Sequence, residues 1–78
     1  MSVTVRLYAG VREGAGTAEV TVEGTTVQEV RDALAEACPN IADRLAFCRF
    51  ALNDEFVDAD APVTDGAEVD VIPPVSGG

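Results

Sequence analysis

The residues best suited to chemistry stand at the end of the chain, where two glycines follow a proline-containing stretch. The last six residues are Pro73, Pro74, Val75, Ser76, Gly77 and Gly78. Two prolines hold a segment extended, and residues without side chains let the backbone thread a narrow channel and approach catalytic groups closely. Two terminal glycines occur by chance in about one chain in 200. The carboxyl group of Gly78 is therefore the first candidate for a reacting group.

A free carboxylate is a weak electrophile, and adenylation by ATP would make it reactive. The acyl adenylate could then accept sulfur and become a thiocarboxylate, which is a sulfur nucleophile. A loop for binding ATP ends in Lys-Ser or Lys-Thr, and this chain contains no lysine. The glycines of Glu13–Gly16 are expected to form a loop instead. We expect the chain to bind no cofactor and a partner protein to use the ATP.

The composition narrows the class of partner. The 78 residues include 14 acidic and 5 basic residues, all arginine, for a formal charge of −9. This charge repels nucleic acid and anionic membranes, and it favours proteins with basic clefts, although solubility alone would also explain it. Cys38 and Cys48 without any histidine make no zinc site. Without a signal peptide or a membrane-spanning apolar run, we expect a cytoplasmic protein with two reduced, structural thiols.

The elements that must position the tail follow from the spacing of apolar residues. Period-two alternation predicts strands, and apolar residues at helical spacing predict a helix with one buried face. The predicted strands are residues 3–8, 18–23, 47–53, 56–57 and 68–72, with a possible helical turn at 11–13, a helix from 27 to 37 and a short helix at 41–45. Turns are predicted at Asn53–Asp54 and Asp65–Gly66.

The main helix has its own start and stop signals. Either Thr25 with Gln28 or Thr26 with Glu29 fits a capping box. The predicted buried positions are Val27, Val30, Leu34 and Ala37, whereas Glu29, Asp32 and Glu36 lie on the polar side. Pro39 should end the helix, and Asn40 could cap the short helix that follows.

The order of elements predicts an α+β fold. One main helix packed on one face of a mixed sheet is the ubiquitin-like β-grasp roll. We expect residues 1–72 to form the β-grasp domain and residues 73–78 to form a flexible tail that ends in Gly-Gly.

Two large apolar side chains break the alternation on the predicted polar faces. Tyr8 shares its face with Thr4 and Arg6, and Ile72 shares its face with Glu68 and Asp70. The first and last strands are neighbours in this fold, so Tyr8 and Ile72 could be adjacent. Such clusters mark interfaces more often than chance placement does. A buried Phe56 and a lone surface Tyr8 remain the alternative.

Four segments carry a resemblance to a known family. The opening strand and turn at 5–13, Asn53, residues 65–69, and above all the Pro-Pro-Val-Ser-Gly-Gly ending resemble the molybdopterin synthase sulfur carrier subunits. The resemblance covers nearly the whole chain. Gly14 departs from it, because a larger apolar residue is expected in the first helical turn, and this departure puts the stability of that turn in doubt.

The resemblance implies a cycle of sulfur transfer in molybdenum cofactor biosynthesis. An E1-like enzyme adenylates Gly78, and a sulfurtransferase system converts it to a thiocarboxylate. The tail then enters the large catalytic subunit of a heterotetramer and gives sulfur to cyclic pyranopterin monophosphate. The carrier itself supplies no acid–base group. The resemblance also places Tyr8, Phe56 and Ile72 at the apolar contact with partners, with Arg12 near that surface.

Other functions remain open from the sequence. Sulfur carriers for thiamine or cysteine synthesis share the fold and the terminal glycines. A ubiquitin-like modifier would instead join its Gly78 carboxyl to lysines of other proteins. An interaction domain with an accidental tail is a further alternative.

Overall fold

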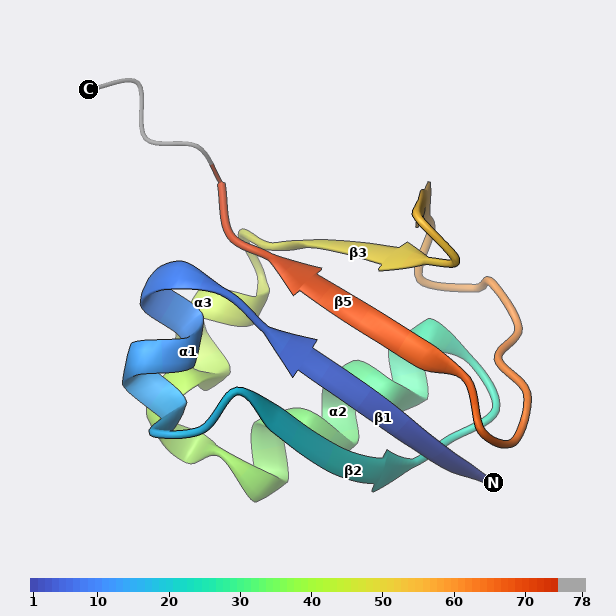
Figure 1. Ribbon diagram of the computed structural model, residues 1–78, viewed down its shortest axis with the longest axis horizontal. Coiled ribbons are helices and arrows are strands. Elements are labelled where there is room, and N and C mark those ends of the chain that lie inside the picture. Colours follow the sequence, from blue (N-terminus) through green and yellow to red (C-terminus); the bar gives the residue numbers. More distant parts are fainter. Residues whose placement is uncertain (75–78) are drawn as a thin grey trace.

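Alternating valines build a five-stranded mixed sheet in the computed structural model, which describes residues 1–74. The strands are β1 (Ser2–Leu7), β2 (Glu19–Glu23), β3 (Arg49–Leu52), β4 (Glu55–Val57) and β5 (Glu68–Ile72). Their order is β2-β1-β5-β3-β4, with β1 and β5 parallel and the other pairs antiparallel. The chain leaves the sheet from β5, its central strand, at the end where β1 also finishes (Figure 1).

Within residues 1–74, four helical segments accompany the sheet. They are α1 (Ala9–Ala15), α2 (Val27–Ala37), the 3₁₀ turn η1 (Pro39–Ile41) and α3 (Ala42–Leu45). Figure 1 shows α2 crossing behind the sheet, whereas the front face carries no helix among the residues described. One main helix on one face of a mixed sheet matches the predicted α+β roll. Within residues 1–74, no helix has the length and apolar character that crossing a membrane requires.

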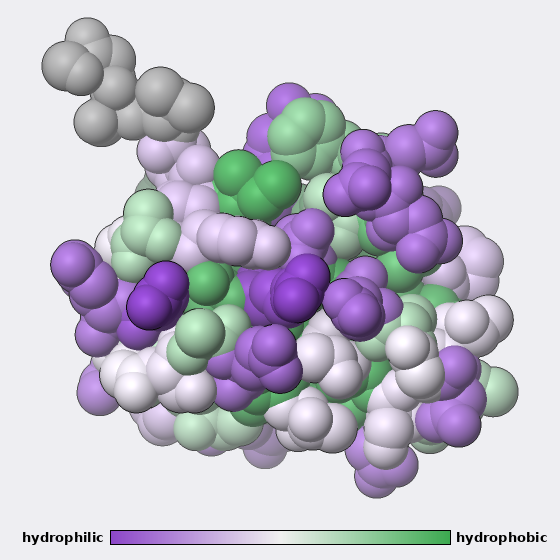
Figure 2. Space-filling view, viewed as in Figure 1, coloured by the Kyte–Doolittle hydropathy of each residue, from purple (hydrophilic) through white to green (hydrophobic). Residues whose placement is uncertain are grey.

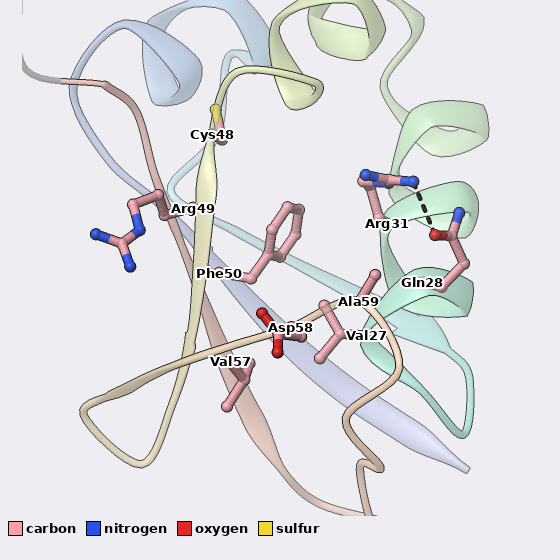
Figure 3. A pocket seen from close by; sticks show the side chains of 9 residues that line it. All are labelled: Val27, Gln28, Arg31, Cys48, Arg49, Phe50, Val57, Asp58 and Ala59. Carbon is pink, nitrogen blue, oxygen red and sulfur yellow. Dashed lines mark hydrogen bonds between the residues drawn. The ribbon is translucent and has the colours of Figure 1, made fainter.

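The core lies between the sheet and α2. Its largest fully buried side chains come from alternate positions of β1 and β5 and from the predicted face of α2, and they include Val3, Val5, Leu7, Val30, Leu34, Val69 and Val71. Figure 3 shows the same alternation on β3, where Phe50 points toward α2 and Arg49 points away from it. Burial of these apolar groups is the main favourable term that holds the roll together.

Where a loop at 13–16 and a possible helical turn at 11–13 were predicted, the chain forms the seven-residue helix α1. Val11 is buried to 2% exposure, and α1 ends at Ala15, followed by its C-cap Gly16 in a left-handed conformation with φ of 77°. Gly10 and Gly14 lie inside α1 and do not break it. A Cβ at Gly14 would lie 2.9 Å from the Cγ2 of Ile41, so the glycine lets α1 approach η1 closely. The missing side chain therefore reflects packing and does not prevent the turn from forming.

Several predicted boundaries and one predicted face were wrong. Tyr8 is extended but forms the N-cap of α1, and β3 begins at Arg49 instead of Phe47. The amide of Phe47 donates to the carbonyl of Arg44 at 3.0 Å, so Phe47 belongs to the turn after α3. Ala37 is exposed near the end of α2. Asn40 lies within η1 and caps nothing, because neither η1 nor α3 has a side-chain cap.

The start of α2 uses the second predicted capping pair. The Oγ1 of Thr26 accepts a hydrogen bond from the amide of Glu29 at 3.2 Å. In return, the Oε1 of Glu29 accepts from the amide and the hydroxyl of Thr25 at 2.8 and 2.9 Å. These bonds to Thr25 lower the pKa of Glu29. Asn53 and Asp54, with φ of 53° and 67°, form the predicted turn between β3 and β4.

Glu29→Gln should flatten the dependence of stability on pH in acid. Because the folded pKa of Glu29 is lowered, its contribution is complete above the ordinary glutamate pKa of about 4.3 and is lost as pH falls through the folded value. Urea unfolding across that acid range measures this change. Glu36→Gln, at an exposed position of the same helix, is the control. Equal slopes for wild type and Glu29→Gln would contradict the capping role.

Gly14→Ala should destabilise the domain by about 1 to 3 kcal/mol, because the new methyl group overlaps the fully buried Ile41. Gly10→Ala is the matched control in the same helix. Its Cβ would meet nothing nearer than Arg44 Nη1 at 3.7 Å, so it should be neutral or stabilising by up to about 1 kcal/mol. Urea unfolding of both variants checks the difference, and a more stable Gly14→Ala would show that close packing is not the reason for the glycine.

Candidate functional site

The root of the tail is fixed by the central strand of the sheet. β5 pairs with β1 on one side and with β3 on the other, and it ends at Ile72. Pro73 and Pro74 follow and have no amide hydrogen to extend either ladder. The other predicted tail residues, Val75, Ser76, Gly77 and Gly78, lie outside the residues that the structure describes. The described part of the candidate site is therefore the surface around Pro73 and Pro74.

Three of the predicted interface residues lie on the front face of the sheet. The cross-strand neighbours Asp70, Ala51 and Phe56 form one row, so their side chains share a face. Ile72 lies two residues after Asp70 on the same face, and Tyr8 is held there by a hydrogen bond from its hydroxyl to Asp70 Oδ1 at 3.2 Å. We call Tyr8, Phe56 and Ile72 the outer patch.

The exposure of these side chains separates them from the core. Tyr8 is 42% exposed and Phe56 is 53% exposed, whereas Ile72 is partly buried. Figure 2 shows apolar surface on this face where the chain leaves the sheet, beside hydrophilic side chains elsewhere. Arg6 belongs to that hydrophilic part and pairs with Glu19 and Glu68 at 3.9 and 3.5 Å. Phe56 is thus not a core residue, and the apolar part of the face adjoins the tail.

Sequence reasoning missed the arginine that supports the outer patch. Arg49 is paired with Ile72 across the ladder, and its guanidinium carbon lies 3.8 Å from the centre of the Phe56 ring. A cation over an aromatic face is attracted by the ring and restricts its motion. Alternation along the predicted third strand, with Phe50 buried, was the signal that places Arg49 on the opposite, outer face.

The fourth predicted interface residue, Arg12, lies to one side. It is exposed on α1, and its amide donates to the carbonyl of Tyr8 at 3.3 Å. No hydrogen bond or ion pair within residues 1–74 holds its guanidinium. The structure therefore places Arg12 within a helical turn of the outer patch but not in it.

The electrostatics of the patch keep Tyr8 a neutral hydrogen-bond donor. Desolvation, the negative charge of Asp70 and the hydrogen bond to Asp70 raise the pKa of Tyr8. The phenol therefore stays protonated at neutral pH and presents a polar end and an apolar ring, a combination common in protein interfaces.

A groove on the other side of the tail root was not predicted. It has a volume of about 440 Å³ and is lined by Ala9, Gly10, Val11, Arg44, Phe47, Cys48, Pro73 and Pro74. Phe47 is 73% exposed. The sequence placed Phe47 in a strand, although a helix that ends at Leu45 leaves no room for a turn before residue 47. That spacing was the signal in the sequence that Phe47 lies in a turn at the surface.

The remaining thiols and cavities offer no reactive centre in the described part of the chain. Cys38 and Cys48 are both free, and burial raises the pKa of Cys48, which keeps its thiol protonated. Among residues 1–74, no group of three or more metal-ligating side chains comes together. A cavity of about 240 Å³ between α2 and β3 (Figure 3) includes Arg31, which donates to Gln28 at 2.8 Å, but no residue of the tail root.

Comparisons with known proteins agree with this architecture. The model of the ThiS family matches residues 5–78. Three curated proteins named molybdopterin synthase sulfur carrier subunit are 32–40% identical to the chain. The one from Chlamydomonas reinhardtii is 40% identical over 84 residues that cover all of both proteins.

Solved structures share the whole fold. A crystal structure of SAMP1 from Haloferax volcanii has a TM-score of 0.91 and 29% identity, with full coverage of both chains. A chain from a complex of subunits 1 and 2 of molybdopterin-converting factor from Helicobacter pylori has a TM-score of 0.74 and 28% identity, also with full coverage. These likenesses confirm the predicted β-grasp fold and the predicted family resemblance.

Proposed function

Since this chain belongs to the ThiS family, we propose that it is the sulfur carrier subunit of a molybdopterin synthase. The observation that carries the proposal is the position of the tail root. Pro73 and Pro74 continue from the central strand, between an apolar outer patch and an apolar groove, and Val-Ser-Gly-Gly follows them in the sequence. A partner that grips this surface receives the end of the chain in one defined direction.

The reacting atom in this proposal is the carboxyl carbon of Gly78. A carboxylate oxygen attacks the α-phosphorus of ATP on the activating enzyme, which gives an acyl adenylate and pyrophosphate. The persulfide of a sulfurtransferase then attacks the carboxyl carbon, AMP leaves, and an acyl disulfide forms. A second thiol attacks the sulfurtransferase sulfur of this acyl disulfide, which forms a disulfide with that thiol and releases the thiocarboxylate. The resulting thiocarboxylate donates its sulfur to cyclic pyranopterin monophosphate, and hydrolysis returns the carboxylate. Two deliveries build the dithiolene of molybdopterin.

The folded domain provides the surface that the partner proteins bind in each of these steps. The tail supplies the sulfur, whereas ATP binding and acid–base chemistry are assigned to partners. The outer patch, with the Tyr8 ring and the Phe56 ring beneath Arg49, offers an apolar surface with two polar ends. Exposed aromatic and arginine side chains of this kind dominate binding energy at interfaces. The large catalytic subunit is the partner proposed for this surface, in a heterotetramer with two copies of each subunit.

A protein modifier is the second candidate, because the TM-score of 0.91 to SAMP1 from Haloferax volcanii exceeds the value of 0.74 for the molybdopterin-converting factor chain. A solved SAMP1 from Methanosarcina acetivorans is named small archaeal modifier protein 1. In that function the Gly78 carboxyl joins an amine of another protein and water or AMP leaves. The chain has no lysine, so it could not itself carry such a branch on a lysine side chain. The two candidates differ in the product, which is a thiocarboxylate in one and an amide bond in the other.

Extension of the chain by one alanine after Gly78 should abolish sulfur transfer in a reconstituted system. The added residue moves the carboxyl group away from the position at which the partner acts, while residues 1–74 and their packing stay unchanged. Sulfur transfer to the pyranopterin precursor measures the effect, and thermal unfolding confirms the intact domain. A Ser76→Ala variant of unchanged length is the control. Full transfer by the extended chain would contradict the role of the terminal carboxyl group.

A further inference from the structure

The most exposed large apolar side chain of the described residues has no role in the function proposed so far. Phe47 is 73% exposed, more than Tyr8 or Phe56, and it lies in the turn between α3 and β3. That turn is well fixed, since the amides of Phe47 and Cys48 donate to the carbonyls of Arg44 and Leu45 at 3.0 and 3.2 Å. Exposure on a rigid turn leaves the ring available to a partner at little entropic cost.

The groove beside Phe47 is suited to an apolar side chain. None of its eight lining residues is acidic, although the chain contains 14 acidic residues. Its one charged lining residue, Arg44, donates through Nη1 to the carbonyl of Gly10 at 2.7 Å. A Cβ at Gly10 would meet only Arg44 Nη1, at 3.7 Å, so the wall of the groove at Gly10 is otherwise open. An apolar group can therefore enter the groove without removing water from any carboxylate that lines it.

Because the tail is short, a partner that binds Gly78 must lie close to this groove. Four residues separate Pro74 from Gly78, and a fully extended chain spans at most about 3.6 Å per residue, or roughly 14 Å in total. A pocket that encloses Gly78 must therefore have its rim close to Pro74. Because Pro73 and Pro74 also line the groove, that rim lies against the groove on one side and the outer patch on the other.

We propose that the groove lined by Phe47, Gly10 and Pro74 is a second docking site, which receives an apolar side chain from the rim of the tail channel of the large catalytic subunit. This proposal rests on the proposed function. The large subunit is chosen because it must hold the carrier through the chemistry of sulfur delivery, and contacts on both sides of the tail increase the buried area and fix the direction of entry.

Phe47→Ala should weaken binding of the full chain to the large subunit by about tenfold or more, which is the effect of an interface anchor. Phe47→Leu, which keeps an apolar side chain, should bind within about threefold of wild type. Asp43→Ala, an exposed change in α3 outside the groove, is the matched control. Isothermal titration calorimetry gives Kd, and the melting temperature should not change, because Phe47 is largely exposed.

The outcomes separate this proposal from the proposed function. Unchanged affinity of Phe47→Ala, beside weakened affinity of Tyr8→Ala, would overturn the second docking site and leave the sulfur carrier function intact. Slower adenylation of Phe47→Ala with unchanged binding to the large subunit would also overturn it, because the groove would then serve the activating enzyme. Failure of the wild-type chain to bind the large subunit would contradict both.

Discussion

The parallel pairing of β1 with β5 is the contact on which the site depends. It joins the two ends of the sequence, so Tyr8 and Asp70, 62 positions apart, share a hydrogen bond. Because both strands finish at the same edge, the tail leaves the sheet where α1 begins. The outer patch and the groove then lie on opposite sides of Pro73. Both are formed by residues in or next to elements that also build the core, and no additional helix or strand is needed. The buried valines of β1 and β5 hold this arrangement in place.

The surface around the tail combines apolar groups with charged ones that are held in place. On the front face, Arg6 forms ion pairs with Glu19 and Glu68, whereas nearer the tail Asp70 and Arg49 hold the rings of Tyr8 and Phe56. A net charge of −9 can steer the chain to a basic partner, and the outer patch can then provide the short-range contact.

The sequence predicted the sheet, the main helix and its capping, because period-two valines and the Thr26–Glu29 pair are local signals. It also predicted apolar side chains beside the tail, since Tyr8 and Ile72 break an otherwise polar face. It predicted only a helical turn within α1, because Gly14 looks like a helix breaker until the nearness of Ile41 is known. It missed the groove, because Phe47 was assigned to a strand and the groove combines residues of α1, α3 and the tail root, which are distant in sequence. Contacts between distant segments carry information that local patterns do not.

The central claim is that Gly78 carries sulfur, and intact mass spectrometry of the protein purified from its own cells tests it most directly. The mass of the whole chain should show replacement of one oxygen by sulfur, fragmentation of the intact ion should place the replacement at Gly78, and the replacement should disappear after incubation with the large subunit and cyclic pyranopterin monophosphate. A chain found only as the carboxylate, together with amide-linked adducts of Gly78 on other proteins, would contradict the sulfur carrier and favour the modifier.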